Sequence, residues 1–200
     1  MFERFFKKKK KGNIIPLEVQ LERLEQLGIS LSSGATIEDL LNEMDREELE
    51  SNPYLSLLIA LGCEFETGEN VWKHISNNIW YLDTECIEDN GDYVRIVERL
   101  ITLSQRALKI ENLSDAIDIE ANEAIISFVL EGEHYSWPME VNDDWLDINL
   151  LSKLNVFLNK LSSEKKFFVA VIDQTCLIGF LKESQVNELN KLIDIRFESI

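Results

Sequence analysis

Apolar residues recur at helical spacing in the first third of the chain. Leucines three or four residues apart follow Pro16, which suits the first turn of a helix, and Gly28 is expected at its C-cap. The periodic positions are Leu17, Leu21, Leu24 and Leu27. The pattern therefore predicts a first helix between Pro16 and Gly28.

Two further helices are predicted before residue 63. Thr36 and Asp39 have the spacing of a capping box, ahead of a helix with apolar positions at Ile37, Leu40, Leu41 and Met44. Asn52-Pro53 then opens a helix over residues 54–61 that Gly62 closes. Because this third helix is apolar on nearly every side, we expect it to be buried.

The pattern changes to strands after residue 77. Aromatic and β-branched residues predict a strand over 78–83, and after an acidic loop at 85–92 a helix is expected over 93–108. Residues 116–120, 124–130 and 134–141 predict an antiparallel meander. Its expected inward positions are Ile117, Ile119, Ile125 or Ile126, Phe128 and Leu130.

The remaining segments complete an α+β pattern. Asp147 is expected to cap a helix that runs to Leu161, with its leucines on one face. Residues 167–173 and 176–181 predict a hairpin, 184–193 a helix and 195–198 a short strand. Strands in runs with helices between them predict an α+β fold, mainly antiparallel, with a helical N-terminal part at 13–62 and a sheet-containing part at 63–200 of a single domain.

The net charge of the chain limits the classes of function that we expect. The 200 residues hold 20 Lys and Arg against 37 Asp and Glu, a net charge of −17. Nucleic-acid binding is therefore not expected, because phosphates repel so acidic a surface. Residues 1–12 oppose this trend with five consecutive lysines behind three phenylalanines. They predict a flexible basic tail, which is solvated, in weak contact with an anionic membrane surface, or folded back onto the acidic body.

Cysteine usage and hydropathy predict a cytoplasmic protein. No apolar run approaches the roughly 20 residues that span a bilayer, and the N-terminus lacks the apolar core of a secretory signal. Three widely spaced cysteines, Cys63, Cys86 and Cys176, favour reduced thiols over disulfides or a zinc site.

One segment, residues 110–152, contains eleven carboxylates and no Lys or Arg. It is either a docking surface for a basic protein, placed on the exposed face of the meander and its rim, or a solvated acidic surface. Two tryptophans in it are either partly exposed anchors or core residues. The candidate partner face is Trp137, Glu140, Asp143, Asp144, Trp145 and Asp147.

An enzyme is the alternative. Asp83 and Glu85, with Asp143, Asp144 or His134, offer oxygen-rich ligands for Mg²⁺ or Ca²⁺, although their spacing matches no metal motif. Nucleophile elbows and phosphate-binding glycine loops are absent from the sequence, and an acidic segment around Cys86 would raise its pKa. No catalytic residue and no cofactor are predicted.

Several segments resemble an uncharacterised bacterial family of acidic α+β proteins, similar in style to the immunity proteins that neutralise toxins. They are residues 80–85 (WYLDTE), 91–93 (GDY), 135–137 (YSW), 143–147 (DDWLD) and 178–180 (IGF). The resemblance implies an inhibitor that occludes a basic protein partner, such as a toxin. It implies no catalytic residue. We therefore expect a binding protein, with a metal-dependent enzyme or a membrane-surface protein as alternatives.

Overall fold

Helices and antiparallel strands follow one another along the chain in separate runs. A computed structural model describes residues 14–67 and 71–200. Over these residues the fold is α+β, with seven helices and three antiparallel sheets, so the predicted fold class is confirmed. The expected basic tail, residues 1–12, lies outside the described residues. Among the helices described, none is long and apolar enough to cross a membrane.

The bounds of the elements are as follows. The helices are α1 (Leu17–Gln26), α2 (Ile37–Glu43), α3 (Arg46–Ser51), α4 (Leu55–Gly62), α5 (Asp92–Leu103), α6 (Asn149–Lys160) and α7 (Glu183–Leu189). The strands are β1 (Glu64–Glu66), β2 (Trp72–His74), β3 (Ile79–Asp83), β4 (Ile110–Asp118), β5 (Glu123–Leu130), β6 (Glu133–Met139), β7 (Lys166–Ile172) and β8 (Thr175–Leu181).

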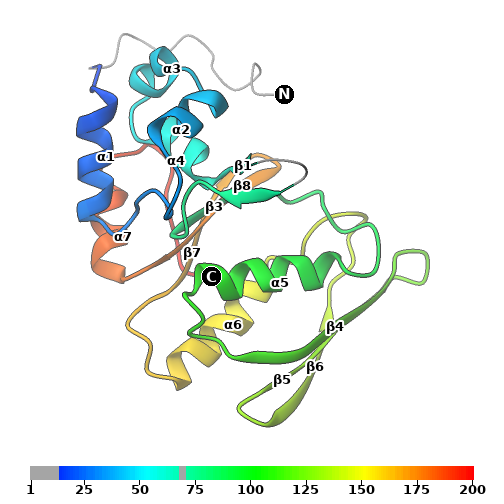
Figure 1. The fold of residues 1–200 in the computed structure, drawn as a ribbon. Coiled ribbons are helices and arrows are strands. Elements are labelled where there is room, and N and C mark those ends of the chain that lie inside the picture. Colours follow the sequence, from blue (N-terminus) through cyan, green and yellow to red (C-terminus); the bar gives the residue numbers. More distant parts are fainter. Residues whose placement is uncertain (1–13, 68–70) are drawn as a thin grey trace.

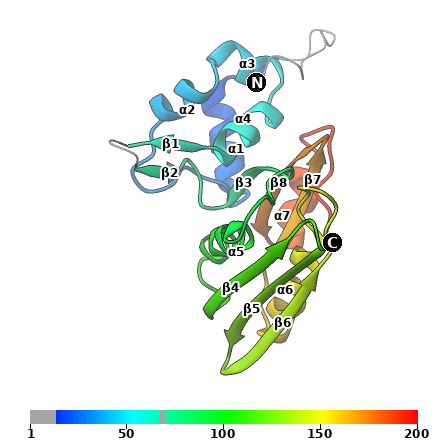
Figure 2. The same cartoon turned by 90° about the vertical axis from the view of Figure 1, so that its right-hand side faces the viewer.

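The central sheet, in the order β3-β8-β7, separates two hydrophobic cores. Alternate residues of β3 point to opposite faces: Ile79 joins the core formed by the N-terminal helices, and Trp80 joins the core formed with α5 and α6. Every residue of the middle strand β8 is buried, as expected for a strand covered on both faces. Figures 1 and 2 show the N-terminal helices on one side of this sheet and α5 and α6 on the other.

The predicted meander forms the outer layer, in the order β4-β5-β6 (Figure 2). Its inner face packs on α5 and α6 through Ile126, Phe128 and Leu130, as predicted. Ile125 instead points outward and is 41% exposed. The first strand differs from the prediction of 116–120, because it begins at Ile110 and ends at Asp118, which leaves Ile119 half-buried in the turn.

Two helix ends agree with their sequence signals. At the end of α1 the amide of Ile29 donates to Leu24 O (2.9 Å) and that of Gly28 to Glu25 O (2.9 Å), with Gly28 at φ +79°. This pair of bonds is a Schellman motif, which needs a left-handed residue that glycine supplies without strain. Thr36 and Asp39 form the predicted capping box of α2.

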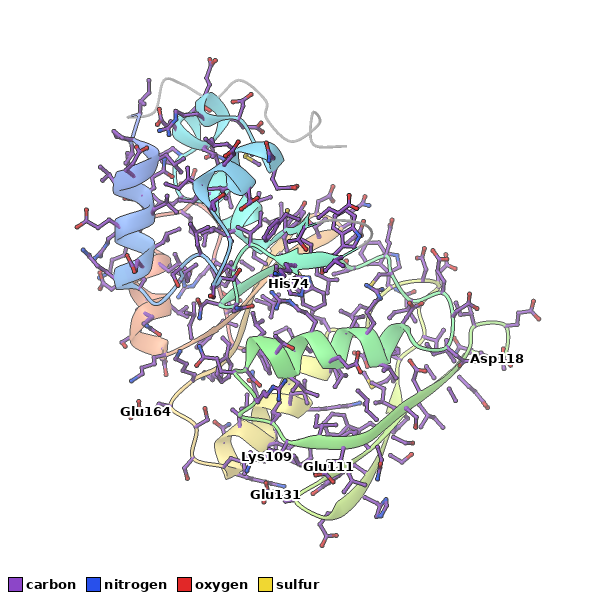
Figure 3. All side chains as sticks on the ribbon, in the orientation of Figure 1. His74, Lys109, Glu111, Asp118, Glu131 and Glu164 are labelled. Carbon is purple, nitrogen blue, oxygen red and sulfur yellow. The ribbon has the colours of Figure 1, made fainter. Side chains whose placement is uncertain are left out.

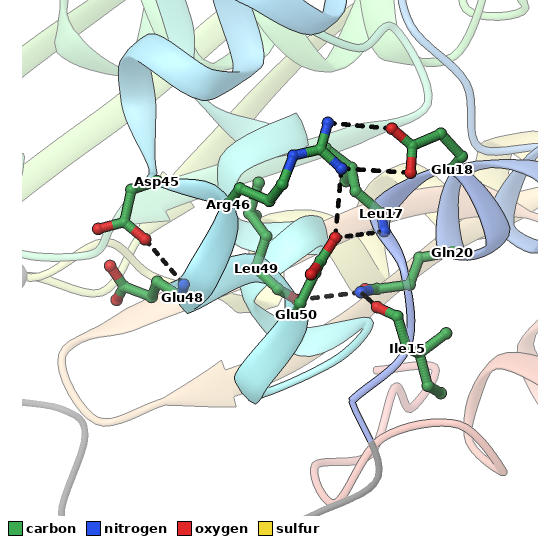
Figure 4. A network of polar contacts seen from close by, with 9 residues as sticks. All are labelled: Ile15, Leu17, Glu18, Gln20, Asp45, Arg46, Glu48, Leu49 and Glu50. Carbon is green, nitrogen blue, oxygen red and sulfur yellow. Dashed lines mark hydrogen bonds and ion pairs between the residues drawn. The ribbon is translucent and has the colours of Figure 1, made fainter.

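Helix α3 was not predicted from the sequence, and polar contacts hold it against α1 (Figure 4). Arg46 of α3 donates to both carboxylate oxygens of Glu18, at 3.0 and 3.2 Å, and to Glu50. Glu50 in turn accepts the backbone N–H of Leu17 at 3.0 Å. With only six residues and the single buried side chain of Leu49, α3 has no apolar period to detect.

Several elements later in the chain are shorter than the sequence pattern predicted. The helix predicted over 93–108 ends at Leu103, because Gln105 and Arg106 both adopt left-handed backbone angles. The helix over 184–193 ends at Leu189, and residues 195–198 form only a single β-bridge between Glu198 and Val169. The helix predicted to reach Leu161 ends at Lys160 with Leu161 as its C-cap, but Leu161 is 40% exposed and does not join the buried face.

Candidate functional site

Two acidic loops lie side by side near the N-terminal end of α5 (Figure 1). Residues 83–87 begin at Asp83, the last residue of β3, and residues 142–146 lie between β6 and α6. The amides of Cys86 and Ile87 both donate to Asp144 O at 2.9 Å, and the amide of Leu146 donates to Thr84 O at 2.8 Å. We call these two segments the acidic loop pair. Their carboxylates are Asp83, Glu85, Asp143 and Asp144.

Trp145 occupies the middle of the acidic loop pair. It forms β-bridges with Glu85 and with Asn142, and its amide donates to Asn142 O at 3.1 Å. Its side chain remains 36% exposed. Asp143, at φ +55°, makes the tight turn and is itself exposed, so a carboxylate and an aromatic ring are presented together.

Asp147 has a structural role. Its Oδ2 accepts the amide of Glu140 at 3.1 Å and its Oδ1 accepts that of Asn149 at 2.9 Å. The carboxylate thus bonds the start of α6, as the sequence suggested, although the N-cap position itself is Ile148. Because both oxygens are engaged, Asp147 positions the loop, and Glu140 is the exposed carboxylate beside it.

A hydrogen bond also joins the backbone at Asp147 to α5. The amide of Asp147 donates to the hydroxyl of Tyr93 at 3.2 Å. Burial is the main reason that the pKa of Tyr93 is raised to about 12, with the Asp147 charge adding to it. The hydroxyl therefore stays protonated at neutral pH and serves as a fixed polar contact.

Trp137 belongs to an aromatic cluster between β6 and α6. Its ring stacks on Phe157 with centroids 5.4 Å apart and an interplanar angle of 9°, and it meets Phe128 edge-on at 4.8 Å. Tyr135 also contacts Phe157, at 4.8 Å. The side chain is half-buried, so of the two tryptophans singled out in the sequence, Trp137 packs on the core and Trp145 is the more exposed.

The carboxylates of the metal alternative share the acidic loop pair without converging. Asp83 Oδ1 accepts the amide of Glu85 at 3.1 Å, and Glu85 Oε2 accepts Gln174 Nε2 at 3.2 Å. His134 lies on β6, where it is exposed. Among residues 14–67 and 71–200, no three His, Cys, Asp or Glu side chains are grouped so that they could hold a metal ion.

The meander itself is acidic only toward its ends. Figure 3 shows Asp118 at one end of the sheet and Glu111 and Glu131 at the other. The outward positions in the middle of β5 are Ile125, Ser127 and Val129, which carry no charge. The carboxylates expected on the exposed face of the meander therefore lie toward its ends and not at its centre.

Asp115 points to the inner side of the meander. Its two oxygens accept the amides of Gly91 (2.7 Å) and Val94 (3.1 Å), which are otherwise unpaired at the start of α5. The negative charge of Asp115 also interacts favourably with the positive end of the α5 dipole. Asp115 is one of the eleven carboxylates of residues 110–152, and its spacing of two from Ile117 places it on the inward face of β4.

The cysteines are unsuited to nucleophilic chemistry. Burial raises the pKa of Cys86 to about 11 and those of Cys63 and Cys176 to about 12. For Cys86 the expected direction is confirmed, but desolvation contributes more than the neighbouring carboxylates. All three thiols are therefore protonated at neutral pH and not nucleophilic.

A buried arginine was not anticipated from the sequence. Arg99 of α5 donates to Ser76 O at 3.0 Å and lies 6.0 Å from the centroid of the Trp80 ring. Desolvation lowers the pKa of Arg99 to about 10. Burial lowers the pKa of His74 to about 4, and the positive charge of the Arg99 guanidinium contributes to this shift. The helical pattern gave no signal, because Arg99 occupies a core position between two apolar turns.

Comparison with known proteins adds nothing to this geometry. No protein-family model, no curated protein and no solved structure matches the chain. The resemblance to immunity proteins therefore stays an expectation from the sequence, and the function has to be argued from the site.

Proposed function

We propose that this protein is a binding protein of the immunity type that occludes a basic partner with the acidic loop pair. The observation that carries the proposal is the backbone pairing of residues 83–87 with 142–146, which places four acidic residues on the two loops that hold the partly exposed Trp145. A large aromatic anchor with a polar surround is typical of binding hot spots.

The charge of the chain suits such a partner. A net charge of −17 attracts a basic protein over distance and raises its association rate. An enzyme that acts on nucleic acid needs a basic groove for the phosphates, and carboxylates at that groove would block it. The mechanism is occlusion, which requires surface complementarity and no catalytic group.

Asp143 and Asp144 provide the test. A candidate partner, identified by co-purification from the native cells, is titrated with the Asp143→Lys/Asp144→Lys variant by stopped flow and calorimetry at two salt concentrations. We expect association at low salt to slow at least ~10-fold, because the reversal removes electrostatic steering. The defect should shrink at high salt, where screening already suppresses steering.

Glu131→Lys/Glu133→Lys is the matched control. It makes the same change in net charge at the exposed β5–β6 turn, outside the acidic loop pair. We expect it to slow association ~2-fold or less. Equal effects of the two reversals, or binding that does not depend on salt, would place the interface elsewhere. Stoichiometric Mg²⁺ or Ca²⁺ lost on Asp143→Asn/Asp144→Asn, with no partner recovered, would instead favour the metal-dependent enzyme.

A further inference from the structure

A shallow hollow lies between β6 and α6, on a surface that the proposed function does not use. Its volume is about 310 Å³, at the low end of the range for small-molecule sites. Its floor is aromatic, formed by Tyr135, Trp137 and Phe157, and Val156 beside it is 52% exposed. The hollow is therefore suited to one large apolar side chain.

Two lysines frame this floor. Lys153 Nζ lies 5.7 Å from the Trp137 ring centroid, and Lys160 Nζ lies 5.4 Å from that of Phe157. Lys153 also donates to Pro138 O at 2.8 Å. Among the described residues, neither ammonium has a carboxylate within 4.0 Å, although the chain carries almost twice as many acids as bases. The hollow is thus a cationic aromatic site on an acidic protein.

Such a site is complementary to an aromatic side chain flanked by carboxylates. The chain contains that arrangement in Asp143-Asp144-Trp145, where the Trp is partly exposed. Insertion of Trp145 would bury aromatic surface against Trp137 and Phe157, and the two carboxylates would pair with the two ammoniums. We propose that the hollow binds the Asp143-Asp144-Trp145 segment of a second copy of this chain.

The segment cannot serve the hollow of its own molecule in this fold. Hydrogen bonds from Cys86, Ile87 and Leu146 hold it against residues 84–87. Hollow and segment both adjoin α6: the segment precedes Asn149, and the hollow lies along Lys153 to Lys160. A two-fold dimer, in which each copy gives its segment and receives the other, makes both contacts at once.

The dimer covers Trp145 and the carboxylates beside it, so it competes with the basic partner proposed above. The two inferences fail separately. A monomeric protein that binds its partner would overturn only the dimer, whereas a salt-sensitive dimer without a partner would overturn only the proposed function.

Charge-swapped variants test the dimer by sedimentation velocity of the full chain. Variant one is Lys153→Glu/Lys160→Glu, and variant two is Asp143→Lys/Asp144→Lys. Each variant alone opposes like charges in both contacts, so we expect dimerisation at least ~10-fold weaker than in the unmodified chain. An equimolar mixture restores both contacts, since the acidic hollow receives the basic segment and the basic hollow receives the acidic one. We expect a dimer in the mixture.

Folding is controlled separately. Circular dichroism and thermal melts compare each variant with the unmodified chain. Lys160→Glu alone serves if the loss of the Lys153 hydrogen bond disturbs the fold, because Lys160 contacts the Phe157 ring and makes no hydrogen bond with the residues that the structure describes. An unmodified chain that stays monomeric at low salt and high concentration overturns the proposal. Dimers that persist when each double variant is measured alone, or a folded mixture that stays monomeric, also overturn it.

Discussion

Asn155 of α6 and Phe167 of β7 are joined by two hydrogen bonds. The side-chain Nδ2 of Asn155 donates to Phe167 O at 2.9 Å, and its Oδ1 accepts the Phe167 amide at 2.8 Å. The amide side chain thus replaces a neighbouring strand at this edge of the central sheet. Asn190 and Phe197 repeat the arrangement near the C-terminus, with bonds of 2.9 and 2.8 Å.

The first prediction is that Asn155→Ala destabilises the protein by about 2–4 kcal/mol. The substitution leaves a buried N–H and a buried C=O without partners, and each costs about 1–3 kcal/mol. Asn159→Ala on the same helix is the control, because Asn159 is exposed, and we expect a change within about 0.5 kcal/mol. Urea denaturation measures both. If Asn155→Ala were as stable as the unmodified chain, water would be replacing the side-chain amide as the partner of Phe167.

The second prediction concerns Asp115 as the cap of α5. Asp115→Ala should cost about 1–2 kcal/mol, because the amides of Gly91 and Val94 lose their acceptor. Glu111→Gln on the same strand removes the charge of an exposed residue and should change little. The free energies of unfolding decide between the roles. If the two variants behave alike, Asp115 acts only as a surface charge.

Much of the fold could be predicted because local signals and burial agree. Residues 124–130 and 176–181 are apolar runs bounded by turns, and both are strands. The limits of elements escaped prediction where a single backbone angle decides them, as at Gln105, whose positive φ has no clear sequence signal. α3 was missed because its partner, α1, is distant in sequence.

The candidate site was only partly predictable. The sequence marked Asp143, Asp144 and Trp145, but their proximity to Asp83 and Glu85 depends on backbone pairing between two loops, which no spacing reveals. The lysines of the hollow were overlooked, because the hollow forms only where Trp137 of β6 stacks on Phe157 of α6, and no spacing along the chain shows that contact.

The third prediction is a loss of stability in acid that depends on His74. Burial, with a contribution from Arg99, lowers the pKa of His74 to about 4, and this outweighs the Glu64 carboxylate 3.3 Å away. The unfolded chain, where histidine titrates near ~6.5, binds the extra proton first. The stability that the neutral imidazole contributes is therefore present above about pH 6.5 and is lost as the pH falls toward 4.

His74→Gln should remove this part of the pH dependence. Between pH 7 and pH 4 we expect the unmodified chain to lose about 1–3 kcal/mol more than the variant. His134→Gln, which removes an exposed imidazole, should follow the unmodified chain. Denaturant titrations across this range provide the comparison, and parallel curves for the His74 variant would contradict the assignment.

The fourth prediction is that Gly62→Ala destabilises the protein, although alanine has a higher helix propensity than glycine. In an exposed helix, alanine is about 1 kcal/mol better than glycine. Gly62, however, ends α4 where that helix packs on β3, and an added Cβ would lie 2.4 Å from the backbone N of Tyr81 and 2.8 Å from its Cβ. Backbone atoms cannot yield as a flexible side chain does, so the helix and the sheet must separate.

We expect Gly62→Ala to cost about 1–3 kcal/mol, the usual range for an overpacked core. Thermal melting at neutral pH measures the change, and Gly62→Ser should be at least as destabilising because it adds a polar atom to the same contact. Since α4 and β3 belong to the core around the central sheet, a local loosening there should also increase amide exchange at Tyr81. A higher melting temperature for Gly62→Ala would mean that propensity outweighs packing and that α4 does not approach β3 this closely.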